Sequence, residues 1–477
     1  MKTENSSLLL RLSLVGIILV FLRPSLSDAR ILNGLNNARL YMMKGLPEEA
    51  EVQFVWIQSI EPWRNLPWSD LAAGYLDQGK SARAIDILEP LSRNHLLDST
   101  AWMTLAKGYE QSGRPGQMED TLLSLVRLKK TGMETELAYQ MLVKLYRSQN
   151  RFEEAYQNQL DLVRLVPANK DYEFEKVLLM LTVNQKEGLQ EWESAPSKPA
   201  WLIQAGNQIA TAHLEKNEAI RRVKIGRAFG GIENWDMAEY WLQQAVDYSP
   251  NFAEAWAFLA EARQQRGLNG SEQINRALHL APDSSGVRGL AALYFRRQHE
   301  YAMALTLLQN NIEDQPAEST WYMELGSVLA ETGKMEDAVT AYQKAAELSP
   351  LDYVKQTALA RFCVQYEYRV SDLGLPAAEK AVGLAPDIPE AQDVYGLLLL
   401  ASGDPEKANQ AFSEALSLNP EYAPTWLHIG QVAITAGNSV LAKEALLKTV
   451  KFSGNSIEGK MARRLLQQYY QIKDDSL

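Results

Sequence analysis

The segment Gly74–Ser81 is a literal match to the phosphate-binding pattern Gly-x-x-x-x-Gly-Lys-Ser. In nucleotide-binding proteins this loop follows a buried strand and opens a helix, so that its backbone N–H groups surround the phosphates. Here residues 68–73, which precede it, have their apolar side chains at helical rather than strand spacing. Gly79 also has the same place in a repeating unit as Gly333, where a lysine follows but no first glycine precedes. The segment therefore predicts a turn between two helices rather than a nucleotide site.

The remaining residues that could do chemistry do not form a recognisable catalytic or metal-binding pattern. The five histidines are not paired at metal-ligand spacing: His95, His213, His279, His299 and His428. The single cysteine, Cys363, excludes an internal disulfide and a cysteine-pair metal site. The patterns Gly-x-Ser-x-Gly and His-Glu-x-x-His do not occur. We therefore expect a non-catalytic protein with no cofactor and no metal.

The composition excludes some classes of partner. The chain has 477 residues, of which 59 are acidic and 48 basic, so the formal charge is −11. Dedicated nucleic-acid-binding proteins need a basic surface that displaces counterions, so we expect no nucleic-acid partner. The apolar fraction of 46% is that of a folded protein.

The first residues differ from the rest of the chain. An apolar run, Leu12–Leu22, follows basic residues and ends at an Arg-Pro pair. Even when it is counted from residue 8 it falls short of the ~20 residues that span a bilayer, but it fits the ~7–15 residues of a signal-peptide core. Small residues precede Asp28 at the places that cleavage requires. Residues 1–29 are therefore predicted to be a signal peptide or a short membrane anchor, with a buried first helix as the alternative.

Either of the first two interpretations makes the remainder of the chain exported or membrane-anchored, on the extracytoplasmic side. Membrane contact would then come only through this N-terminal segment, because no later segment approaches membrane length.

A period of 34 residues organises the rest of the chain. It separates Trp68 from Trp102, and the residues at positions 222 and 392 from Trp256 and Trp426. The unit 322–350 shows the pattern best, with these marked positions: Tyr322, Leu325, Gly326, Leu329, Gly333, Ala338, Tyr342, Ala345 and Pro350. Offsets of 3 and 4 place these residues on one stripe of each of two helices, and Gly333 falls where the chain must turn. A single hairpin cannot bury both stripes, so the units must stack.

This pattern resembles the tetratricopeptide repeat (TPR). Eleven units can be counted by the small residue of the second helix or its equivalent: Ala50, Ala84, Met118, Ala155, Ala238, Gly270, Ala304, Ala338, Gly374, Ala408 and Ala442. The resemblance implies an all-α, right-handed α-solenoid of TPR helix hairpins. We expect about four repeats in residues 30–169, an irregular helical linker in 170–218, about seven repeats in 219–456 and a capping helix in 457–473.

In a TPR array the first helices line a concave face, where partners bind. The positions that project into it are predicted to be Arg39, Ala73, Lys107, Lys144, Arg227, Glu261, Ala292, Ser327, Arg361, Leu397 and Gln431. Five of these residues are basic, and Arg147, Arg288 and Arg296 are expected nearby. This favours an acidic or extended peptide segment as partner, with chance placement of solvated charges as the alternative.

Toward the C-terminus the same surface becomes apolar, through Leu397, Leu400, Leu427 and Ile434. These residues predict a docking groove for a partner helix or strand, unless the capping helix or a second copy of the chain covers them.

Together these features favour a non-catalytic TPR scaffold or adaptor that mediates protein–protein interactions in a bacterial-type cell envelope or at its surface. Two alternatives stay open. One is an accessory subunit of, or a protein related to, TPR-bearing glycosyltransferases. The other is a self-assembling structural protein, which would make the chain a homo-oligomer.

Overall fold

The computed structural model describes residues 29–61, 66–93, 97–128, 131–195, 198–453 and 456–472. The predicted signal peptide or anchor lies outside them, except for residue 29, with which the first helix begins. The described residues are almost entirely helical and contain no strand, which confirms the all-α prediction.

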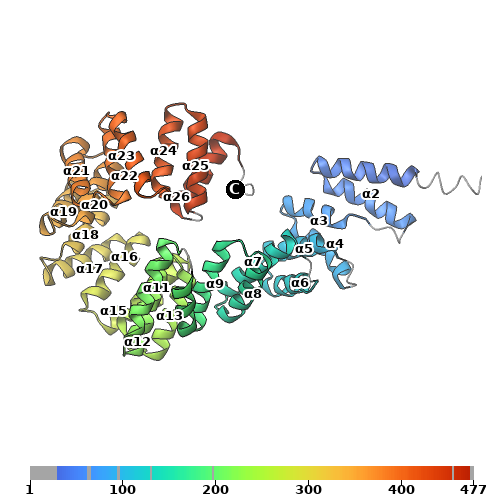
Figure 1. Cartoon of the computed structure of the whole chain (residues 1–477), viewed down its shortest axis with the longest axis horizontal. Helices are drawn as coiled ribbons and strands as arrows, with labels where there is room; N and C mark the ends of the chain where they lie inside the picture. Colours follow the sequence, from blue (N-terminus) through green and yellow to red (C-terminus); the bar gives the residue numbers. More distant parts are fainter. Residues whose placement is uncertain are drawn as a thin grey trace, which may run out of the picture. The chain divides into compact units, whose positions relative to one another are not determined.

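The helices follow one another with short turns, and they fall into two compact units that we describe separately (Figure 1). The first unit comprises the described residues up to Asn217 together with Lys224–Trp241. Its helices are 29–43, α2 (Pro47–Ile60), α3 (Trp68–Asp77), α4 (Ser81–Arg93), α5 (Ser99–Gln111), α6 (Pro115–Arg127), α7 (Met133–Ser148), α8 (Phe152–Leu165), α9 (Lys170–Val183), α10 (Gln185–Ser194) and α11 (Ala200–His213).

Two helices cross the division between the units, α12 (Glu218–Gly230) and α13 (Trp235–Tyr248). The second unit continues with α14 (Ala253–Gln265), α15 (Ser271–Leu280), α16 (Ser285–Arg297), α17 (Tyr301–Asp314), α18 (Ser319–Glu331), α19 (Met335–Leu348), α20 (Tyr353–Gln365), the π-helix η1 (Val370–Gly374), α21 (Leu375–Leu384), α22 (Pro389–Ala401), α23 (Pro405–Leu418), α24 (Ala423–Thr435), α25 (Ser439–Ser453) and α26 (Ile457–Tyr470).

Besides Arg369, which is a second left-handed residue in the segment after α20, each of the eleven predicted hairpins turns through one residue in the left-handed backbone region. Seven of these residues are glycines and four are not: Gly45, Gly79, Gly113, Asn150, Glu233, Gly267, His299, Gly333, Glu367, Gly403 and Gly437. In the turn after α18, for example, the N–H of Gly333 donates to the carbonyl of Ala330 at 3.0 Å, and the N–H of Lys334 donates to that of Leu329 at 2.9 Å. These bonds satisfy carbonyls that the helix end would otherwise leave without partners.

Small residues bring the two helices of a hairpin close together. Ala338 and Ala408 are fully buried at the predicted place in the second helix. On the first helix, a Cβ added at Gly396 would lie 2.6 Å from Cε1 of Phe412, so the aromatic ring packs directly on the helix backbone. This alternation of small and large residues fills the space between the helices to the density of a protein core.

The described residues of the region predicted to be an irregular helical linker, 170–218, lie mostly in the helices α9, α10 and α11. Trp192 of α10 lies over Gly206 of α11, where an added Cβ would be 2.1 Å from the indole. The indole Nε1 of Trp192 donates to the carbonyl of Leu202 at 3.0 Å. The rings of Phe174 and Trp201 pack edge to face with centroids 6.3 Å apart, which ties α9 to α11.

The predicted insertion near residues 365–375 takes the form of the π-helix η1, which leads directly into α21. A Cβ at Gly374 would lie 2.6 Å from Cβ of Cys363, so only glycine lets η1 approach α20 this closely. The buried Cys363 thiol therefore acts as a packing residue, and burial raises its pKa to about 11.

Candidate protein-interaction surfaces

The phosphate-loop-like segment forms the turn between α3 and α4. Gly74 lies inside α3, where an added Cβ would be 2.8 Å from Cε of Met42, and Gly79 is the left-handed turn residue with a φ of +73°. Lys80 forms an ion pair with Glu48 of α2. The segment thus joins two repeats, and it lacks the strand-to-loop geometry that cradles phosphate.

Arg147, which was expected to face a partner, is held by groups of the first unit. Its Nε donates to Oδ2 of Asp236 at 2.7 Å, its Nη2 donates to Oδ1 of Asn234 at 2.6 Å, and it forms an ion pair with Glu175. These bonds tie α7 to α9, to the first turn of α13 and to the loop before it. The guanidinium therefore holds helices together, a role that spacing along one helix could not reveal.

Arg288 and Arg296 are likewise engaged within the second unit, contrary to their expected role. Arg288 is 6% exposed and donates to Oδ1 of Asn311 at 2.7 Å. Arg296 forms an ion pair with Glu324 at 3.1 Å. Burial raises the pKa of the Glu324 carboxyl, while the nearby Arg296 opposes that shift. These two arginines bind other helices of the same chain because an amide of α17 and a carboxylate of α18 lie within reach.

The other five predicted cations are exposed. Arg39, Lys107, Lys144 and Arg227 belong to the first unit and Arg361 to the second. Lys144 is 83% exposed on its side chain, and its Nζ lies 3.9 Å from Oε1 of Glu110, one turn after Lys107. Arg361 is half exposed and forms an ion pair with Glu390. The first unit therefore offers most of the accessible positive charge at these positions.

The predicted apolar groove near the C-terminus is filled by the chain itself. Leu427 is 6% exposed and belongs to a core with Leu446 and Leu466, against which Ile434 also packs. Leu397 and Leu400 pack in the core between α22 and α23. Because Leu466 is on α26, the structure shows the alternative in which the capping helix covers this surface, rather than an open groove.

A hollow that was not predicted from the sequence lies on the first unit, where α2 faces α3 and α4. It has a volume of about 540 Å³ and is lined by Glu48, Glu51, Val52, Val55, Trp56, Ser59, Tyr75 and Arg83. A second hollow of about 570 Å³ shares Glu51, Val55 and Arg83 and extends along α4. Together they form a groove between α2 and α4, which we call the α2–α4 groove.

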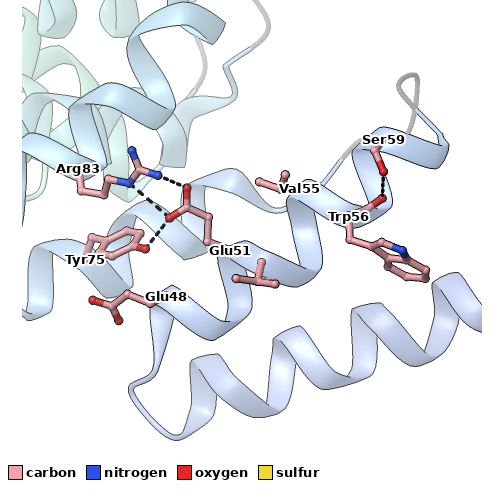
Figure 2. Close-up of a pocket in the computed structure, with 8 residues that line it drawn as sticks. Glu48, Glu51, Val55, Trp56, Ser59, Tyr75 and Arg83 are labelled. Carbon is pink, nitrogen blue, oxygen red and sulfur yellow. Dashed lines mark hydrogen bonds and ion pairs between the residues drawn. The ribbon is translucent and has the colours of Figure 1, made fainter.

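The polar side of the α2–α4 groove centres on one carboxylate. Figure 2 shows Glu51 between Tyr75 and Arg83. The hydroxyl of Tyr75 donates to Oε2 of Glu51 at 2.5 Å, and Nε of Arg83 donates to the same oxygen at 3.3 Å. Burial, followed by this hydrogen bond, raises the pKa of Tyr75 to about 12. The hydrogen bond from Lys80 lowers the pKa of Glu48 at the rim. The acidic and basic groups therefore balance one another along this rim.

The apolar side of the groove is unusually exposed. Val52 is 64% exposed and Val55 56%, although each is a large aliphatic residue in the middle of a helix. Trp56 lies beside them and packs on the first helix, 2.9 Å from where a Cβ on Gly34 would be. The sequence contained a sign of this surface, because α2 has apolar residues both in the buried stripe Ala50, Phe54 and Ile57 and outside it. The prediction considered only the first helix of each repeat and therefore missed it.

Within the described residues, no helix combines the length and the apolarity needed to cross a membrane. The same residues contain no cluster of three or more histidine, cysteine or acidic side chains that could hold a metal ion.

Comparison with known proteins identifies the repeats. Residues 290–353 and 399–466 each match a family profile described as Tetratricopeptide repeat. A stretch of 181 residues is 26% identical to Protein O-mannosyl-transferase TMTC1 of Homo sapiens and covers 36% of this chain and 20% of that protein. A stretch of 117 residues is 31% identical to Tetratricopeptide repeat protein 33 of Xenopus laevis and covers 24% of this chain and 44% of that protein. The chain thus spans less than half the length of either relative.

Among solved structures, the crystal structure of yeast Tom70 aligns over 92% of this chain and 96% of its own, with 13% identity and a TM-score of 0.44. The matched segments lie in α16–α20 and in α22–α26, among helix hairpins of the same length and turn geometry. Residues 290–353 and 399–466 of this chain are therefore tetratricopeptide repeats.

Proposed function

We propose that this chain is a non-catalytic scaffold that binds other proteins in a bacterial-type cell envelope or at its surface. Tetratricopeptide repeats supply a preformed surface on which affinity comes from many distributed contacts. The short apolar segment before residue 29 supports export or membrane anchoring, because its length fits a signal-peptide core.

The proposal of an acidic segment as partner rests on two exposed lysines. Lys107 of α5 and Lys144 of α7 have the same place in consecutive repeats, and both are exposed. Nζ of Lys144 lies 3.9 Å from Oε1 of Glu110 and the lysine side chain is 83% exposed, which leaves that ammonium largely solvated. An extended acidic segment lying across α5 and α7 could meet both lysines without first breaking a buried ion pair.

Binding of a short, unstructured peptide rich in aspartate and glutamate tests this proposal. Fluorescence anisotropy would compare the wild-type chain with Lys107→Glu/Lys144→Glu. We expect the double variant to bind about tenfold more weakly, because roughly 1.4 kcal/mol of charge interaction is lost. The control is Lys186→Glu/Lys216→Glu, which makes the same change in net charge at two other exposed lysines. Equal weakening by both double variants would show a non-specific effect of charge and contradict the proposal.

Location is tested separately. Fractionation of cells and sequencing of the mature N-terminus should find the chain outside the cytoplasm, beginning at Asp28 if the segment is cleaved. Recovery of the unprocessed chain from the cytoplasm would refute this part of the proposal.

A second candidate function is that of an accessory subunit of, or a protein related to, TPR-bearing glycosyltransferases. The 26% identity to an O-mannosyl-transferase over 181 residues favours it. Purified chain, alone or added to membranes, would be assayed for transfer of labelled mannose to a serine- and threonine-containing peptide. Transfer that requires the chain would replace the scaffold proposal.

A further inference from the structure

The outward face of α2 differs from the same face of every other second helix. Two positions after the buried small residue that marks each repeat, α2 has Val52. The corresponding residues in other repeats are polar in most cases, such as Asp86, Asp120, Gln157, Thr306, Thr340, Gln410 and Glu444. Six positions after the small residue, α2 has Trp56, where α19 and α25 have Lys344 and Lys448. The apolar face is therefore a property of the first described repeat and not of the repeat in general.

This face is large and continuous for one helix. Val52, Val55, Trp56 and Ile60 follow one another at helical spacing, and all four are exposed by more than a third. Exposed apolar residues that stand alone are ordinary, but a stripe of four beside a groove marks an interaction surface. Two valines at its centre would let another helix approach closely.

The charges around the stripe indicate what covers it. Glu48 pairs with Lys80 and Glu51 pairs with Arg83, so two anions and two cations border the stripe and balance one another. A strongly basic or strongly acidic partner would repel half of this rim. A surface that carries the same two anions and two cations in the reverse order would place each charge opposite a charge of the other sign. A second copy of this chain, related by a two-fold axis, presents such a surface.

We propose that this chain forms a symmetric dimer in which the exposed stripes of α2 from two copies pack against each other. The two α2 helices run antiparallel, Val52 and Val55 of each copy contact those of the other, and the Glu48–Lys80 pairs of the two copies exchange partners across the axis. The dimer surface is distinct from the lysines of α5 and α7, so this inference is independent of the proposed partner.

The first test is the mass of the full-length chain in solution, measured by sedimentation over a series of concentrations. The wild type should sediment at twice 53.6 kDa. Val52→Lys should sediment as a monomer, because it would bury a lysine ammonium of each copy, one facing the other, at the axis.

Thr340→Lys is the matched control, and it should leave the dimer intact. Thr340 has the same place on α19 as Val52 on α2, and Glu336 precedes it by four residues as Glu48 precedes Val52. Both substitutions therefore gain the same Glu–Lys helix pair, and differ in the surface they alter. A wild-type monomer at every concentration, or a Val52→Lys dimer, would overturn the proposal and leave the groove to another protein.

A crosslink locates the surface independently. Under mild oxidation Val55→Cys should form a disulfide-linked dimer, since Cys363 is buried and does not compete. Ser413→Cys, at the same place on α23, should stay unlinked. Equal crosslinking of the two variants would place the contact elsewhere and refute the α2 interface.

Discussion

Replacing Gly333 by alanine isolates the energetic contribution of a turn residue. Gly333 has a φ of +77° between α18 and α19, and a Cβ built on it meets no atom within 4 Å. The substitution therefore changes only backbone energetics. Holding an L-residue in the left-handed region costs about 1–2 kcal/mol, whereas alanine restricts the unfolded chain and returns about 0.4–1 kcal/mol. We expect a net loss of about 1 kcal/mol in the free energy of unfolding.

Gly383 of α21 provides the control within the same unit. A Cβ there also meets nothing within 4 Å, but its backbone is helical and its φ is not positive. Gly383→Ala should therefore raise the free energy of unfolding by about 0.5–1 kcal/mol. The same glycine-to-alanine change is thus expected to lower the free energy of unfolding at Gly333 and to raise it at Gly383.

The assay is the urea midpoint of the full chain, followed by circular dichroism, together with amide hydrogen exchange in α19. Exchange is needed because repeat arrays do not always unfold in one step. Shifts in the same direction for Gly333→Ala and Gly383→Ala would refute the argument that the turn requires a left-handed residue.

Three further predictions concern packing and pH. Gly396→Ala should lower the free energy of unfolding by about 1–3 kcal/mol, because the new Cβ falls 2.6 Å from a carbon of Phe412; thermal unfolding should show partial recovery when Phe412→Leu is added. Leu466→Ala, which empties a fully buried position on α26, should cost about 2–5 kcal/mol and speed hydrogen exchange throughout that helix. Tyr75, whose folded-state pKa is about 12, favours the folded chain fully below pH 10, and this contribution is lost as the pH rises from 10 through 12. Urea unfolding at a series of pH values should therefore show that the wild type loses more stability over this pH range than Tyr75→Phe, and equal losses would contradict the assigned pKa.

The sequence was sufficient to predict features that depend on neighbours along the chain. Buried alanines such as Ala338 and turn glycines such as Gly333 lie at the predicted places, because helix spacing and the need for φ > 0 are local constraints. The same register predicts the turns at Asn150 and His299, where no glycine marks the left-handed residue. At these two positions the packing of the flanking helices determines the turn. Asn150 and His299 therefore adopt a positive φ in spite of its energetic cost.

Features that depend on distant residues could not be predicted. Arg147 was assigned to a binding surface, yet its partner Asp236 is 89 residues further along the chain. No periodicity encodes which carboxylate a long side chain will meet after the linker helices fold. Leu427 was ambiguous for a related reason, since its burial depends on α26 folding back over α24. Sequence spacing gives the face of a helix that a residue occupies, but not what covers that face.

The two ends of the described chain differ in whether a further helix covers the apolar residues of the terminal repeat. At the C-terminal end α26 covers Leu427, although Ile457 and Met461 of α26 are themselves exposed beside polar residues such as Lys460 and Arg464. At the N-terminal end Met43 is 81% exposed and Val52 64%, and no described residue covers them. A charged residue should therefore have opposite consequences at the two ends. Leu466→Asp should unfold the end of the array, whereas Val52→Lys should leave the unfolding free energy of the monomer nearly unchanged and abolish only its self-association. If Val52→Lys instead destabilises the monomer as strongly as Leu466→Asp, α2 is part of a core, and its exposed stripe is not an interface.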